Sequence, residues 1–86
     1  MNNMNKLEIL KDALEGRENE IFNYQINIDN FSLAIVKIKE EHAGERGMRE
    51  FTKNLKERLE ETKTEQLKSI IIRDVLVDQI AELESL

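Results

Sequence analysis

The sequence contains no cysteine, no proline and no tryptophan, and only three of its 86 residues are glycine. The absence of cysteine excludes a disulfide framework and a thiolate metal site, and it agrees with a reducing cytoplasm, where we expect the protein to reside. Without proline, no helix is broken by a residue that lacks its backbone N–H. Aromatic residues make up 5% and charged residues 36%, a balance typical of long helices or coiled coils and not of sheet proteins.

Long hydrophobic runs are also missing. The apolar runs are short, as at Ile70–Ile72, whereas a helix needs about 20 apolar residues to cross a bilayer. We therefore expect a protein without a membrane partner. A chain of 86 residues has room for one domain with a small core. Its formal charge of -5 argues against a dedicated nucleic-acid binder.

The first half of the chain has a heptad pattern. Eleven positions follow alternating steps of three and four residues, and Arg17 and His42 are the only basic members. Such spacing places one stripe along a helix, and a partner helix must cover it. The stripe consists of Leu7, Leu10, Leu14, Arg17, Ile21, Tyr24, Ile28, Phe31, Ile35, Ile38 and His42.

A glycine-containing segment at 43–47 divides the chain into two nearly equal arms. Gly44 and Gly47 can adopt the left-handed conformations that end a helix and redirect the chain. The segment predicts an all-α fold, an antiparallel two-helix coiled-coil hairpin with arms at about 4–42 and 48–86. One uninterrupted helix through both glycines is the alternative. Gly16 lies inside the heptad pattern without shifting its phase, so we expect the first helix to continue through it.

The hairpin predicts a register in which the numbers of facing residues add to about 90. This register places apolar residues of the two arms opposite each other. It pairs Leu7 with Leu83, Leu10 with Ile80, Leu14 with Leu76, Phe31 with Leu59 and Ile35 with Leu55. The full predicted seam is Leu7, Leu10, Leu14, Arg17, Ile21, Tyr24, Ile28, Phe31, Ile35, Leu55, Leu59, Asp74, Leu76, Ile80 and Leu83.

Arg17 interrupts the apolar seam, and two interpretations remain open for it. An ion pair with Asp74 would compensate the charge and help to fix the register. Alternatively, the side chain emerges along the helix surface and keeps its guanidinium in water.

More apolar side chains are present than one helical neighbour can cover. In the first arm they occupy heptad positions away from the seam, and in the second arm they cover a wide arc. Self-association into a four-helix bundle or a larger assembly, with a dimer favoured, would bury this surplus; a different protein is the other candidate occupant. The predicted interface residues are Phe22, Ile26, Leu33, Val36, Ile71, Val75 and Leu86.

The residues that usually carry catalysis are not grouped in this sequence. His42 is the only histidine, and no serine has a base nearby in sequence. The acidic residues around His42 have no metal-ligand spacing. We therefore expect no catalytic site, no cofactor and no metal.

Four cations recur at three- and four-residue steps and so share one helix face: Arg46, Arg49, Lys53 and Lys56. Interleaved glutamates favour a solvated surface for this face, and contact with an anionic ligand is the other interpretation. Our leading hypothesis is a non-enzymatic association module that binds another protein as an adaptor, assembly factor or small inhibitor, of the kind phages encode. The alternative is an oligomeric protein that sequesters an anionic, nucleotide-like ligand. A third interpretation, an acidic mimic of DNA, is favoured less because the net charge is small.

Overall fold

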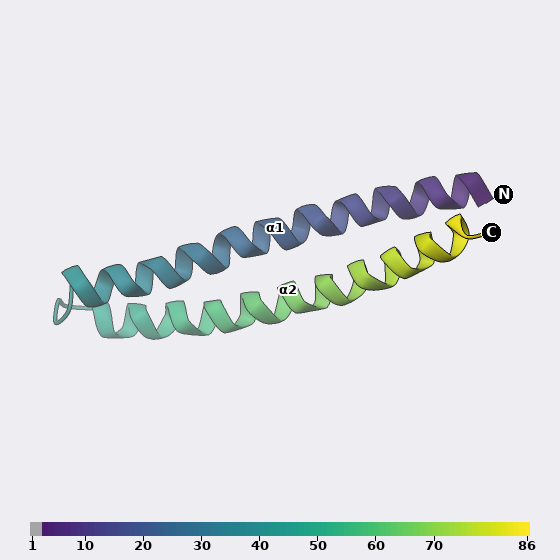
Figure 1. Ribbon diagram of the computed structural model, residues 1–86. Helices are drawn as coiled ribbons and strands as arrows, with labels where there is room; N and C mark the ends of the chain where they lie inside the picture. Colours follow the sequence, from purple (N-terminus) through teal and green to yellow (C-terminus); the bar gives the residue numbers. More distant parts are fainter. Residues whose placement is uncertain (1–2) are drawn as a thin grey trace.

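The computed structural model describes residues 3–86, with side chains from Met4 onward, as two antiparallel α-helices (Figure 1). Helix α1 spans Asn3–Glu41 and helix α2 spans Met48–Glu84. The two helices pack against each other, and no strand occurs among residues 3–86. The predicted all-α hairpin is therefore confirmed, and the alternative of one uninterrupted helix is excluded.

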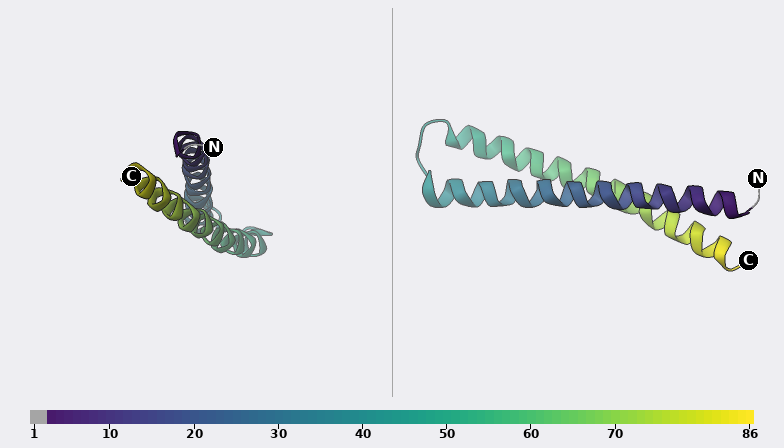
Figure 2. Two further views of the ribbon diagram at one scale, coloured as in Figure 1. Left: turned by 90° about the vertical axis from the view of Figure 1, so that its right-hand side faces the viewer. Right: turned by 90° about the horizontal axis from the view of Figure 1, so that it is seen from above.

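The hairpin is a thin rod. Its principal extents are 62 × 18 × 15 Å, so it is more than three times as long as it is wide. Figure 2 shows that the helices cross at a shallow angle and that both chain ends lie at the same end of the rod. Each helix consequently has a single neighbour within the chain, and most of its circumference faces solvent.

The connection between the helices depends on two glycines with left-handed backbone. Gly44 has a φ of 86° and Gly47 a φ of 84°, values that side chains with a Cβ strongly disfavour. Backbone hydrogen bonds join the intervening residues: Glu45 N–H donates to the carbonyl of His42 at 3.1 Å, and Met48 N–H donates to the carbonyl of Glu45 at 3.2 Å. The His42 ring contacts the Glu45 carboxylate at 3.0 Å. These contacts hold the reversal of chain direction in one conformation.

The core is a single line of side chains between the helices. Its buried aliphatic members are Ile28, Ile38, Leu55, Leu76 and Ile80. Other seam residues are half-buried because nothing packs over the open sides of a two-helix contact: Leu7, Leu10, Leu14, Arg17, Ile21, Tyr24, Phe31, Ile35, Leu59 and Leu83. The core is therefore small for the length of the helices.

Glycine-to-alanine substitutions at three positions should have opposite effects on stability. Gly16 lies inside α1, and a Cβ there would meet no heavy atom within 4 Å. Gly16→Ala should raise the free energy of unfolding by about 0.5–1 kcal/mol, because glycine costs that much in a helix interior. Gly44→Ala and Gly47→Ala should each lower it by about 1–2 kcal/mol, since alanine disfavours positive φ. Urea unfolding at one fixed protein concentration measures the free energy of unfolding of all three variants. A change of the same sign for Gly16→Ala and Gly44→Ala would contradict the helical conformation of Gly16 or the left-handed conformation of Gly44.

Candidate binding surfaces

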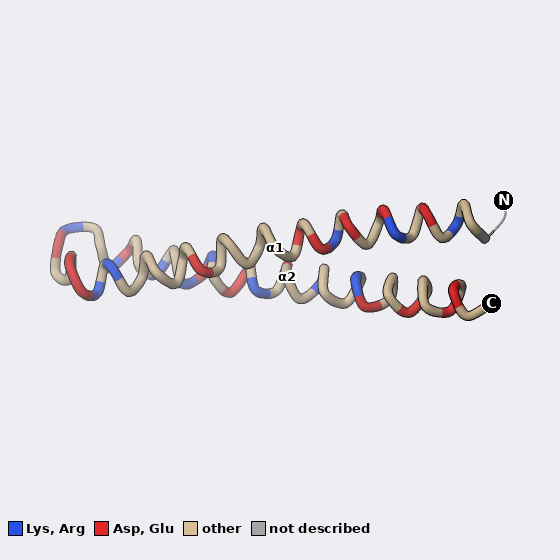
Figure 3. The backbone as a smooth tube through the Cα atoms, turned by 45° about the horizontal axis from the view of Figure 1, so that its top comes forward, with Lys and Arg blue, Asp and Glu red and all other residues tan. Residues whose placement is uncertain are grey.

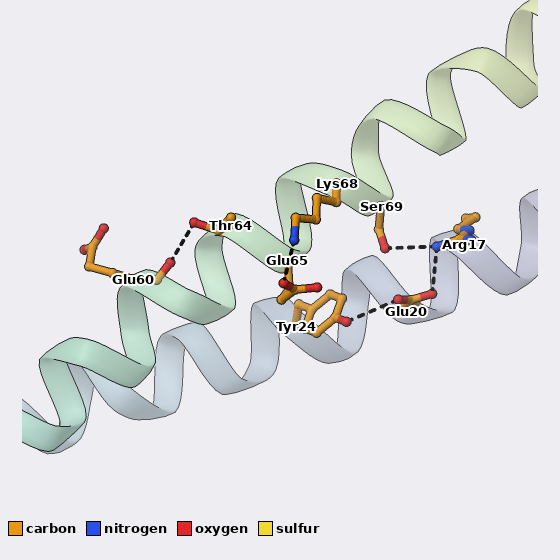
Figure 4. A network of polar contacts seen from close by, with 8 residues as sticks. All are labelled: Arg17, Glu20, Tyr24, Glu60, Thr64, Glu65, Lys68 and Ser69. Carbon is orange, nitrogen blue, oxygen red and sulfur yellow. Dashed lines mark hydrogen bonds and ion pairs between the residues drawn. The ribbon is translucent and has the colours of Figure 1, made fainter.

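A polar cluster interrupts the seam near the middle of the rod. Ser69 is 2% exposed, and a guanidinium nitrogen of Arg17 lies 3.5 Å from its hydroxyl (Figure 4). The same nitrogen lies 3.4 Å from a carboxylate oxygen of Glu20, whose other oxygen accepts a hydrogen bond from the Tyr24 hydroxyl at 3.2 Å. The contacts of Arg17 are long and therefore weak. Glu20 nevertheless provides an opposite charge, and Ser69 a hydrogen-bond acceptor, for the Arg17 guanidinium at the seam.

Gln66 extends this cluster toward the corner. Its side-chain amide donates to the backbone carbonyl of Ile21 at 3.2 Å and to Oε1 of Gln25 at 2.9 Å. These bonds join α2 to α1 with specific geometry, whereas apolar contacts alone tolerate sliding. The cluster therefore fixes the register of the hairpin.

The Arg17–Asp74 ion pair, one of the two interpretations left open for Arg17, does not form among the described residues. Asp74 is exposed and pairs with its own neighbour, Arg73, at 3.0 Å. Arg17 instead emerges beside the seam toward Glu20 and Ser69, closer to the alternative interpretation. The physical reason is rotation: adjacent residues on a helix lie 100° apart, so Arg73 takes the half-buried position and Asp74 faces away.

Four exposed apolar residues of α1 form a row that we call the α1 outer row: Phe22, Ile26, Leu33 and Val36. Phe22 is 65% and Leu33 68% exposed, so neither is covered by α2. Only one charged residue, Asp29, occurs between positions 21 and 36. Figure 3 shows this part of α1 mostly in tan, with charges more frequent elsewhere.

A second exposed row lies on α2, at Leu67, Ile71 and Val75, which we call the α2 outer row. These residues are four positions apart and each is more than half exposed. Leu86, also predicted to contact a partner, is 87% exposed near the open end of the rod. The predicted interface residues are thus uncovered within the chain.

An open groove of about 830 Å³ lies where the helices approach the corner. Ile35, Ile38 and Met48 contribute apolar surface to it, and these side chains are half-buried or buried. Its cationic lining comes from Arg49, Lys53 and Lys56, as the sequence predicted, and from Lys39 of α1. Arg46, the fourth predicted cation, is exposed and does not line the groove.

Sequence reasoning missed several residues of these surfaces. Ser69 and Gln66 continue the heptad spacing of α2, but their side chains carry no apolar signal. Lys39 lies on the other arm from the predicted cations and is brought to them only by the fold. The predicted register of about 90 places Lys39 opposite residue 51, near Lys53. This register could therefore have identified Lys39 as a neighbour of the predicted cations.

Two further observations concern the described residues. No group of three or more histidine, aspartate or glutamate side chains between residues 3 and 86 is arranged to hold a metal ion. Neither α1 nor α2 combines the length and the apolar character needed to cross a bilayer.

Tyr24 provides a spectroscopic test of the polar cluster. Its pKa is raised above 10.0 by partial burial, by the hydrogen bond to Glu20 and by the negative charges of Glu20 and Glu65. Because the folded state favours the neutral phenol, its stabilising contribution is present below pH 10 and is lost as the pH rises through the folded pKa. Tyr24 is the only tyrosine, so tyrosinate absorbance reports it alone. Glu20→Gln should lower its pKa, while Glu8→Gln, farther along α1, should not; an ordinary pKa in the unmodified chain would contradict the cluster.

Comparison with known proteins adds no assignment to these surfaces. No protein-family model matches the chain, and no curated protein or solved structure is significantly similar to it. The surfaces themselves must therefore carry the functional argument.

Proposed function

We propose that the protein is a non-enzymatic helical association module, which pairs with a second copy through the α1 outer row and binds another protein. The observation that carries this proposal is the uncovered α1 outer row, in which Phe22 and Leu33 are each about two-thirds exposed. Contiguous apolar patches of this kind mark interaction sites on soluble proteins.

The surface area of the chain supports association. The hairpin exposes 6718 Å², whereas a compact monomer of its mass would expose roughly 5,300 Å². The surplus of roughly 1,400 Å² exceeds the roughly 800 Å² per partner that a standard interface buries. One long side of the rod therefore has enough surface for a stable contact.

The spacing of the α1 outer row favours a second copy of the chain. Phe22 and Val36 lie seven residues on either side of Asp29, and Ile26 and Leu33 lie at three and four residues from it. The row consequently has nearly the same pattern in both chain directions. An antiparallel copy related by a two-fold axis near Asp29 would place Phe22 and Ile26 of one chain beside Leu33 and Val36 of the other, and these apolar contacts must outweigh the repulsion between the two Asp29 carboxylates at the axis. This pairing would complete a bundle of four helices.

The α2 outer row suits a different protein. Ile71 and Val75 lie closer to the open end than the α1 outer row, so an α1-to-α1 contact leaves these two residues uncovered. An apolar stripe at steps of four residues is the feature by which helices dock into apolar grooves of their partners. Adaptor, assembly-factor and inhibitor roles all require such a surface.

Substitution of two members of the α1 outer row tests self-association. Phe22→Asp combined with Ile26→Asp should raise the dimer dissociation constant at least about a hundredfold, because each buried apolar side chain contributes about 1.5–3 kcal/mol. Light scattering behind a sizing column measures the mass, and circular dichroism checks that the helices persist.

A matched control uses the same residue types elsewhere on the surface. Ile9 is 56% exposed, close to the 51% of Ile26, and Phe51 is 47% exposed against 65% for Phe22; both lie outside the α1 outer row. Ile9→Asp combined with Phe51→Asp should keep the mass of the unmodified protein. Equal masses for both double variants, or a monomeric unmodified chain, would contradict self-association through the α1 outer row.

A further inference from the structure

The groove at the corner combines apolar and cationic surface in one place. Ile35, Ile38 and Met48 form its apolar part, and four cations line the same space from both helices: Lys39, Arg49, Lys53 and Lys56. Two carboxylates, of Glu45 and Glu57, also line it, so cations outnumber acids there. The balance contrasts with the chain as a whole, whose formal charge is -5.

The four cations of the groove are not engaged by other side chains of residues 4–86. Elsewhere in the described chain, Lys11, Lys37, Lys63 and Lys68 each form an ion pair with a nearby glutamate. Within residues 4–86, no ion pair or side-chain hydrogen bond holds any of the four groove cations. One of the two acids in the groove, Glu45, is already in contact with His42 at 3.0 Å. The positive charge of the groove is therefore available to an external anion.

The size of the groove favours a small molecule. Its volume of about 830 Å³ lies within the roughly 300–1,000 Å³ of small-molecule sites. Along α2 its lining extends from Met48 to Glu57, a length of about 15 Å at 1.5 Å per residue. This length accommodates an extended alkyl chain. A free inorganic anion has no apolar group to bury against the apolar part of the groove, so that part would contribute nothing to its binding.

We propose that the corner groove binds a small organic anion with an apolar tail, such as an alkyl phosphate or a fatty carboxylate in monomeric form. The tail lies over Ile35, Ile38 and Met48, and the anionic head reaches Lys53 and Lys56 with Lys39 and Arg49 alongside. No member of the α1 outer row lines the groove. The two surfaces are therefore separate, and the ligand site goes beyond the association function.

Calorimetric titration with decyl phosphate, kept below its micelle-forming concentration, tests the site. The unmodified protein should bind decyl phosphate, and inorganic phosphate and uncharged decyl maltoside should each bind at least about tenfold more weakly, because each lacks half of the recognised chemistry. Lys53→Gln combined with Lys56→Gln should weaken decyl phosphate binding about tenfold or more, as expected for lost contacts to a charged group. Circular dichroism confirms that the variants remain helical.

The matched control is Lys63→Gln combined with Lys68→Gln, which removes two cations of α2 outside the groove. This variant should bind decyl phosphate like the unmodified protein. Equal losses in both double variants, equal binding of decyl maltoside, or binding only to vesicles of phosphatidylglycerol would overturn the proposal. The Phe22→Asp and Ile26→Asp variant should retain decyl phosphate binding even as a monomer, so failure of the ligand site and failure of self-association give different results.

Discussion

Each helix of this protein has only one neighbour, and the other properties of the structure depend on that constraint. A side chain between two helices is fully covered only when it lies on the line that joins their axes. Ile28, Leu55, Leu76 and Ile80 lie on this line and are buried, whereas most seam residues beside them remain half-exposed. A core of this size stabilises a chain only slightly. Burial of the apolar side chains on the outer faces would add to this stability, and within a two-helix hairpin only association can bury them.

The polar cluster in the middle of the seam has a role that apolar packing cannot provide. Heptad contacts are nearly repetitive, so a hairpin with a uniform seam would have several registers of similar free energy. Gln66 bonds to Gln25 and to the backbone of Ile21, and buried Ser69 leaves room for Arg17. A shift by one heptad would separate these partners and leave polar groups without bonds beside the seam. Specificity of register is thus obtained at the cost of some apolar burial.

Much of the fold was predictable from the sequence, because the spacing of Leu7 to Ile38 requires a partner helix and two glycines near the midpoint favour a hairpin over one uninterrupted helix. Other features depend on information that hydropathy does not contain. Arg73 and Asp74 are adjacent, and an error of one residue in the register exchanges the buried position between them. The polar seam residues of α2, such as Gln66, resemble surface residues until a facing helix is placed beside them. Of the groove, the sequence predicted Arg49, Lys53 and Lys56, but Lys39 lies on the other arm and joins them only through the fold.

The tight corner also has a consequence for the order in which the hairpin folds. In a register that adds to about 90, pairing of Ile38 with Thr52 closes a short loop, while pairing of Leu7 with Leu83 joins residues separated by almost the whole chain. Loop-closure entropy grows with the length of the closed segment, so the first contacts form beside Gly44 and Gly47, and pairing then proceeds toward the free ends. The last turns to close are also the first to open, so amide hydrogen exchange should be slowest in the half of the rod nearest the corner.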